Sequence, residues 1–272
     1  MNALTGAFDW LGDGKNWHGD AGIQHRLLEH LGFTGLSMLL ACLIALPVAL
    51  WLGHLGKGGA LAVNISNIGR AVPTLALLAL LSLTPLRQHG ETPTLIALVL
   101  FAIPPVLTNA YIGMREADRA VVEAARGMGM SGGQVFLRVE LPLAFPLLMT
   151  GIRSAAVQTV ATATLAAIPG GGGLGRVITA GFNLQNTSQV VAGALLVALL
   201  ALLVEGLLVL LGRWADPMRH RRAKAAVPSG GTGASGGTGT SGDGRGPGTS
   251  GTGTSGTGAS GTGASAEPAA VA

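Results

Sequence analysis

The side chains best suited to act on another molecule lie in one polar stretch, residues 115–140, between two apolar blocks. Within it, Glu123 and Arg126 can supply charged contacts, and the small Ala124 and Ala125 between them allow a partner surface to approach closely. The stretch holds no nucleophile with a neighbouring base, which covalent catalysis requires. The chemistry that it predicts is therefore recognition of a partner protein.

The same stretch favours two short helices joined by a turn. Residues 120–126 suit a helix, whereas residues 127–133 hold too many glycines to continue it. Residues 134–141 can form a second short helix before Pro142, which is tolerated in the first turn of the helix that follows. We expect a helix–turn–helix element that protrudes from the apolar part of the chain.

The sequence shows no residue cluster typical of catalysis or metal binding. Cys42 is the single cysteine and lies in an apolar block, which excludes a disulfide or a cysteine-ligated metal site within the chain. The six histidines stand at scattered positions, mostly in predicted loops: His18, His25, His30, His54, His89 and His220. We expect no metal ion and no bound cofactor.

A glycine cluster reading PGGGGLG formally satisfies the dinucleotide-binding pattern through Gly170, Gly172 and Gly175. However, no strand precedes the cluster, and Arg176 and Val177 stand where a phosphate-binding loop needs lysine and serine or threonine. A flexible loop at an outer gate is the better interpretation. The loop is therefore not expected to bind a nucleotide.

Several polar residues interrupt the apolar blocks. Arg70 either extends its side chain to the membrane surface or borders a translocation pathway together with Asn67 and the helix break expected at Pro73. Glu205 lies in the last apolar block, eight residues before Arg213. A partly solvated or helix-paired carboxylate is favoured there over a proton relay.

Composition places the whole chain in a membrane. Of its 272 residues, 49% are hydrophobic and 11% are charged, whereas soluble domains carry about 25% charged residues. Each apolar block is long enough for about 20 helical residues, as a bilayer requires. The blocks span about residues 31–53, 61–83, 93–112, 142–168 and 190–211. They predict an all-α membrane protein with about five transmembrane helices, and no basic patch with interleaved aromatics suggests nucleic acid.

The basic residues predict the orientation of the chain. Lysine and arginine concentrate in residues 115–140 and after the last block, so both segments are expected in the cytoplasm and the N-terminus outside. Residues 1–30 are predicted to be extracytoplasmic, and they carry too many aspartates for a signal peptide. Residues 225–272 are rich in glycine, threonine and serine, which predicts a disordered cytoplasmic tail.

The polar stretch resembles the coupling loop of bacterial ABC importer permeases, in which E-A-A is followed by glycine, an aliphatic residue and L-P at fixed intervals. The matching residues are Glu123, Ala124, Ala125, Gly129, Val139, Leu141 and Pro142. In that family the loop docks into a groove of the ATP-binding subunit and transmits its closure to the membrane helices. The resemblance implies the same coupling role here, and a type I ABC importer permease domain over residues 31–213 with its coupling loop at residues 115–141.

A narrower resemblance covers residues 31–213. RAVPTLALLALL and TATLAAIPGGGGLG resemble segments of permeases for glycine betaine, choline, carnitine and proline. This chain departs from their pattern at Pro169 and at Arg70, where glutamine is common. The resemblance implies import of osmoprotectants of this class, and the departures leave the exact solute open.

The resemblance also implies the partners. They are ATP-binding cassette ATPase subunits, an extracytoplasmic solute-binding protein and a second permease subunit, either the same chain or a related one, in the bacterial cell membrane. The chain has few aromatic residues for an aromatic cage, so high-affinity selection is expected in the binding protein. Alternatives are an ABC permease for another small solute, such as methionine, and a secondary transporter driven by an ion gradient.

Overall fold

The structure is a computed structural model that describes residues 3–216. Within that range, a few side chains are not described: those of Leu61, Ala62, Val63, Ile65, Arg70 and Arg87. The regular elements of the described part are all helical. The predicted tail, residues 225–272, lies outside the described residues.

The helices follow one another along the chain, with short 3-10 turns between some of them. They are α1 (Ala3–Gly12), α2 (Ile23–Leu55), α3 (Gly59–Ala71), α4 (Thr74–Ser82), α5 (Thr92–Arg115), α6 (Arg119–Gly127), α7 (Gly132–Val135), α8 (Leu141–Ala163), α9 (Gly175–Asn183) and α10 (Thr187–Ala215).

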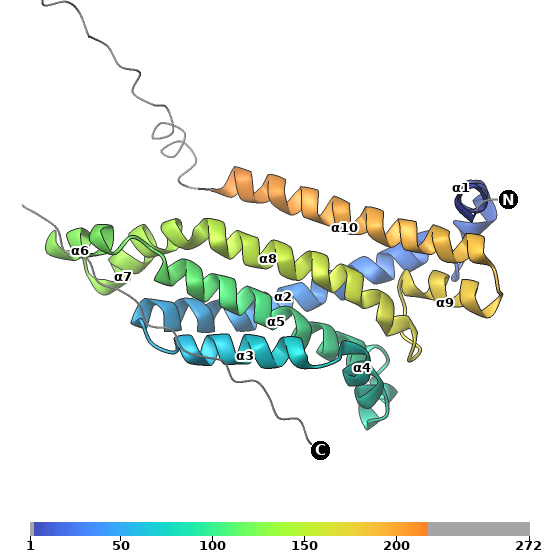
Figure 1. The fold of residues 1–272 in the computed structure, drawn as a ribbon, viewed down its shortest axis with the longest axis horizontal. Helices are drawn as coiled ribbons and strands as arrows, with labels where there is room; N and C mark the ends of the chain where they lie inside the picture. Colours follow the sequence, from blue (N-terminus) through green and yellow to red (C-terminus); the bar gives the residue numbers. More distant parts are fainter. Residues whose placement is uncertain (1–2, 217–272) are drawn as a thin grey trace, which may run out of the picture. The chain divides into compact units, whose positions relative to one another are not determined.

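Four stretches of helix in the described part are long and apolar enough to cross a membrane. They are α2, α5, the run Gly132–Ala167 that contains α7 and α8, and α10. Figure 1 shows them side by side along one direction. Four of the five predicted blocks are thus confirmed as long helices, although α2 begins at Ile23, eight residues before the predicted start.

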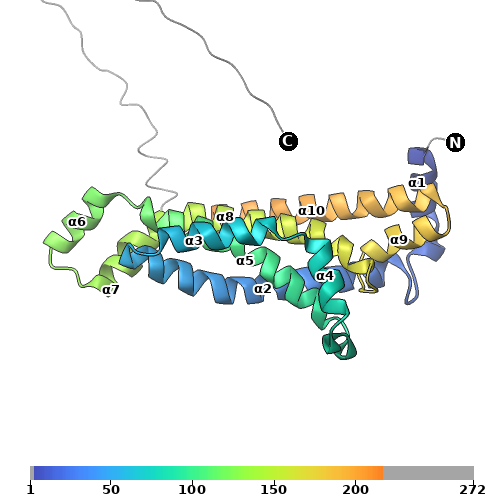
Figure 2. The ribbon, with the colours of Figure 1, turned by 60° about the horizontal axis from the view of Figure 1, so that its bottom comes forward.

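The predicted block over residues 61–83 differs, because it forms two short helices instead of one. α3 ends at Ala71, and Val72 is extended, with φ −73° and ψ 121°. The proline ring sterically disfavours a helical conformation for the residue before it. Pro73 also lacks the N–H that would continue the backbone hydrogen bonds of the helix. α4 then leaves in a new direction, which Figure 2 shows clearly. Neither piece alone has the length of a span.

Small residues hold the long helices together. α5 packs between α2 and α8, and a side chain at Gly53 would place its Cβ 2.5 Å from the Cβ of Met114. Ala45, Ala49 and Ala155 are fully buried in the same core. Without a hydrophobic driving force between helices in lipid, such small residues bring the backbones close enough for dispersion contacts.

Large apolar side chains instead cover the outside of the bundle. Leucines and a tryptophan on α2 and α10 are largely exposed: Leu39, Leu43, Trp51, Leu199, Leu202, Leu203, Leu207 and Leu210. An apolar surface of this extent is unfavourable in water and is typical of contact with lipid.

The two ends of the long helices carry different elements. α6, α7 and the C-terminal end of α10 lie at one end, which we call the coupling end, and α1 and α9 lie at the other, the outer end (Figures 1 and 2). The basic stretch of residues 115–140 and Arg213 therefore share one end. This arrangement agrees with the predicted orientation, which itself stays a prediction.

Candidate functional site

The element at the coupling end begins with α6. Asp118 caps it by accepting a hydrogen bond from the backbone N–H of Ala120 at 2.9 Å. α6 ends because Gly129 adopts φ +83°, a left-handed conformation that favours glycine. The backbone N–H of Met130 then donates to the carbonyl of Ala125 at 3.2 Å and closes the turn. The predicted first helix and its glycine stop are confirmed.

The second helix differs from its prediction in where it starts and in how it ends. α7 starts at Gly132 behind a capping box, in which Ser131 donates its backbone N–H to the Gln134 side chain at 2.9 Å. The chain then runs through a π-helical turn, Phe136–Glu140, directly into α8. The element is therefore joined to a membrane helix without an intervening loop.

A small core gives the element its shape. Val122, Ala125 and Val135 are buried against one another, with Met130 and Val139 packed around them. Of the residues that match the coupling pattern, Ala125 and Val139 thus point inward and stabilise the turn.

The other matching residues take different places. Glu123 and Ala124 are exposed on α6, and the neighbouring Met128 exposes 77% of its surface. Leu141 and Pro142 are half-buried at the start of α8, where Leu141 packs against the main core. The exposed face of α6 therefore combines a charge, a small residue and an apolar side chain.

A hydrogen bond to a buried carboxyl group joins the element to a second membrane helix. Glu140 is only 4% exposed, and its Oε2 lies 2.5 Å from Nδ1 of His54, close to the end of α2. The ring of Phe136 packs edge-on against His54, with 5.4 Å between centroids. The sequence alone does not predict this pairing. Glu140 does offer a signal, since it is a lone acidic residue at the start of an apolar block.

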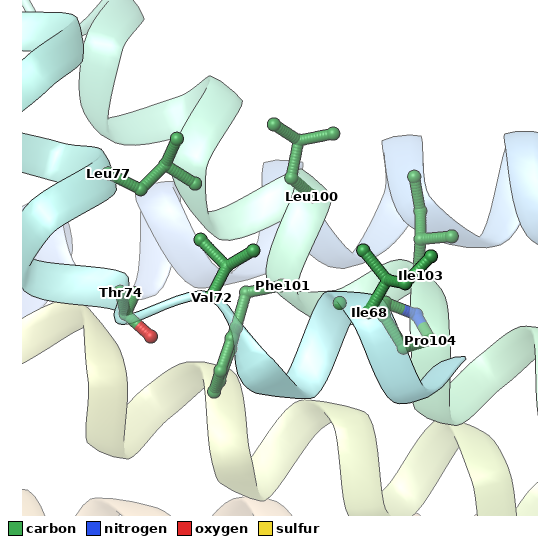
Figure 3. Close-up of a pocket in the computed structure, with 9 residues that line it drawn as sticks. Ile68, Val72, Thr74, Leu77, Leu100, Phe101, Ile103 and Pro104 are labelled. Carbon is green, nitrogen blue, oxygen red and sulfur yellow. The ribbon is translucent and has the colours of Figure 1, made fainter. Parts of the chain in front are cut away.

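Two of the three predicted pathway residues have described side chains, and the pathway role of the three stays a prediction. Asn67 is exposed on α3, Pro73 is exposed where α4 begins, and the side chain of Arg70 lies outside the described part. A cavity of about 320 Å3 does lie beside the break, and Figure 3 shows apolar side chains around it with Thr74 as the polar exception. Its lining residues are Ile68, Gly69, Val72, Thr74, Leu77, Leu100, Phe101, Ile103 and Pro104.

The glycine-rich loop at the outer end is held more firmly than its composition predicts. Glu29 accepts a hydrogen bond from the N–H of Gly173 at 2.9 Å. The buried His30 accepts one from the N–H of Leu174 at 3.3 Å and faces the carbonyl of Val160 at 3.0 Å. Because Nδ1 accepts, the proton of His30 sits on Nε2, which donates to Val160.

Two further charged groups meet the same loop. Arg176 donates to the carbonyls of Gly170 and Gly171 at 2.7 and 2.8 Å. Burial raises the pKa of Glu91, which precedes α5, and the nearby carboxylate of Glu29 raises it further. The loop is thus surrounded by acidic and basic side chains that come from separate parts of the chain.

Comparisons with known proteins agree with this architecture. Residues 40–217 match the family model described as "Binding-protein-dependent transport system inner membrane component". The choline transport system permease protein OpuBB of Bacillus subtilis is 34% identical over 202 residues, which cover 74% of this chain and 92% of that protein. The carnitine transport permease protein OpuCB of Listeria monocytogenes is 37% identical over 185 residues, 66% of this chain and 84% of that protein.

A solved structure shares the fold. A chain of the inward-facing MetNI methionine ABC transporter superposes with a TM-score of 0.60 at 23% identity, over 70% of this chain and 94% of its own length. At this level of identity, the similarity supports a shared arrangement of helices and no more specific property.

Proposed function

This chain belongs to the family of binding-protein-dependent transport system inner membrane components, and we propose from this that it forms the membrane pathway of an ATP-driven importer for osmoprotectants such as glycine betaine, choline, carnitine or proline. It is a multi-pass membrane protein with the fold of ABC importer permeases. The observation that carries the choice of solute is that relatives matching over most of their length are permeases for choline and carnitine.

The family implies ATPase subunits and a solute-binding protein as partners. We assign the ATPase contact to the exposed face of α6, with Glu123, Ala124 and Met128. Its charge can pair with a basic group in the ATPase groove, Ala124 allows close approach, and Met128 can adapt to an apolar partner surface. The inward Ala125 and Val139 keep this face rigid.

We expect movement of the ATPases to reach the membrane helices through two connections, one along the backbone and one between side chains. α7 continues through the π-helical turn into α8, and the Glu140–His54 pair ties the same turn to α2. When ATP draws two ATPase subunits together, the coupling elements of two permease subunits approach each other. The pathway between the permeases then changes from inward-facing to outward-facing, and solute enters from the binding protein.

The proposal is tested by reconstituting this chain in liposomes with the ATPase and the solute-binding protein that co-purify with it from its own cells. ATP-dependent uptake of glycine betaine, choline, carnitine or proline is the expected result, with methionine as the control solute. Uptake of methionine alone would overturn the solute class. Uptake by this chain alone, driven by an ion gradient without the ATPase, would overturn the importer mechanism.

A further inference from the structure

Two residues of opposite charge lie at membrane depth on neighbouring helices. Arg153 stands in α8, twelve residues after Leu141, which is about 18 Å along the helix from its start at the coupling end. Glu205 stands in α10, ten residues before Ala215, about 15 Å from the same end. Arg153 therefore lies near the middle of a hydrocarbon core of about 30 Å, and Glu205, six residues before the end of its apolar block at residue 211, lies about 9 Å inside the same core.

The two residues line one pocket of about 370 Å3, together with Ser154, Val157, Gln158 and Ala161. Ser154 and Gln158 are both exposed on α8, so the pocket offers a cation, an anion, a hydroxyl and an amide. By contrast, the pocket between α2, α8 and α10 that includes Cys42 and Leu207 is lined almost entirely by apolar side chains. The polar groups are thus gathered on one side of α8.

The charges of Arg153 and Glu205 stand apart from other charged groups in the described part of the chain. Among the described residues, Arg153 and Glu205 have no hydrogen-bonding partner and no ion pair within 4.0 Å. Charged side chains at this depth are costly, and they usually pair with one another or mark a route for ions or solutes. Since both face the same pocket and stay unpaired, a dipolar guest between them would satisfy both at once.

A second pocket lies next to the first, on its coupling-end side. Arg153 also lines this second pocket of about 250 Å3, which contains Thr150, Arg213 and Asp216. The polar side chains therefore follow the groove between α8 and α10 from the middle of the membrane to the end where we expect the cytoplasm. A binding site with a polar exit is the arrangement that translocation requires.

We propose that the pocket between Arg153 and Glu205 is an intramembrane site for the transported solute, a small zwitterion with a carboxylate and a quaternary ammonium group. The Arg153 guanidinium is a fork of donors that matches a carboxylate. A quaternary ammonium has no N–H to donate, so the Glu205 carboxylate holds it by charge alone. The inference rests on the proposed function, because the solute class comes from there.

The first test compares solutes in the complete importer. Arg153→Gln is expected to lower uptake of glycine betaine about tenfold more than uptake of choline, which has no carboxylate. Glu205→Gln is expected to lower uptake of both. Assembly with the ATPase, measured by co-purification, stays unchanged in both variants. An equal loss for the two solutes with Arg153→Gln, or no loss, would assign the pair a structural role and overturn the site.

A second test does not depend on which solute the wild type prefers. Cys42 is the single cysteine, so Cys42→Ser provides a background for Gln158→Cys and for the control Leu202→Cys on the lipid-facing surface of α10. A charged, water-soluble thiol reagent is expected to label Gln158→Cys but not Leu202→Cys, and imported solute is expected to slow the labelling. If the reagent labels neither cysteine, the proposed site is wrong.

The two hypotheses fail in different ways. If the wild-type importer moves no osmoprotectant, the proposed function is wrong and the site loses its ligand. Suppose instead that the wild type imports osmoprotectants, that Arg153→Gln lowers uptake of glycine betaine and choline equally, and that the cysteine at position 158 stays unlabelled. In that case the proposed function stands and the site is wrong.

Discussion

His54 and Glu140 meet across 86 residues of sequence, with 2.5 Å between Nδ1 and Oε2. The contact joins the end of α2 to the turn that precedes α8, and the Glu140 side chain is withdrawn from solvent. A buried carboxylate depends on the partner that it meets, since its desolvation is otherwise uncompensated.

Replacing His54 is therefore expected to destabilise the chain. His54→Ala leaves the Glu140 carboxylate buried without its imidazole partner, at a cost of about 1–3 kcal/mol. His54→Asn keeps a donor near the position of Nδ1 and should recover part of the loss. Thermal unfolding in detergent measures both variants against His89→Ala, which removes an exposed histidine. Equal melting temperatures for the three variants would contradict a stabilising role for the pair.

Gly129 and Gly127 allow a matched test of the turn after α6. A Cβ added at either position would have no neighbouring atom within 4 Å, but only Gly129 of the two has positive φ. Gly129→Ala should cost about 1–2 kcal/mol through its left-handed backbone, whereas Gly127→Ala should be neutral. Co-purification of the ATPase and ATP-dependent uptake are expected to fall only for Gly129→Ala, and a similar fall for both variants would argue against the backbone as the cause.

Ala124 and Ala125 are neighbours with opposite environments, exposed and 2% exposed respectively. Ala125→Leu overfills the small core against Val122 and Val135 and should lower stability by about 1–3 kcal/mol. Ala124→Leu should leave stability unchanged and weaken ATPase binding, because it removes the space for close approach. Melting temperature and ATPase co-purification separate the two effects. The assigned docking face is wrong if Ala124→Leu binds the ATPase as the wild type does.

Glu91 predicts a pH dependence at the outer end. Its pKa is raised above the ordinary value of 4.5, chiefly by burial. The folded state therefore holds this proton to higher pH than the unfolded state, and stability contributed by Glu91 is lost as pH rises through the raised pKa. Glu91→Gln keeps the neutral form at every pH.

The stability of Glu91→Gln relative to the wild type should thus increase as the pH rises from the ordinary value of 4.5 through the raised pKa of Glu91. The measurement is the difference in melting temperature between variant and wild type across that range, with the exposed Glu116→Gln as control. A difference that stays constant with pH would show that Glu91 does not titrate in the folded protein as its burial requires.

Much of the fold follows from local patterns. Long apolar runs predict α5, α8 and α10, and Pro73 predicts the break between α3 and α4 because its effect on Val72 is local. The turn at Gly129 is predicted for the same reason. The start of α2 at Ile23 does not follow from hydropathy, because the residues before Leu31 include His25, Arg26 and Glu29. These charges are compatible with a helix end that leaves the membrane, but they interrupt the apolar run that marks a span.

The contacts between distant parts of the chain could not be predicted in this way. Glu140 with His54, and Glu29 with Gly173, are separated by 86 and 144 residues, so no periodicity relates them. Arg153 does not stand out in the sequence, because a single charge hardly changes the hydropathy of a long block. Its relation to Glu205 depends on which faces of α8 and α10 meet. The residues that match the coupling pattern are recognisable because the pattern lies within one short segment.

The uninterrupted run Gly132–Ala167 has a mechanical consequence. Its 36 residues form a helical run of about 54 Å, with the proposed ATPase contact beside one end, Arg153 near the centre and the glycine-rich loop just past the other end. A tilt of about 10° around the centre would displace the two ends by about 5 Å in opposite directions. A run that tilts as one body would thus open one side of the membrane while it closes the other.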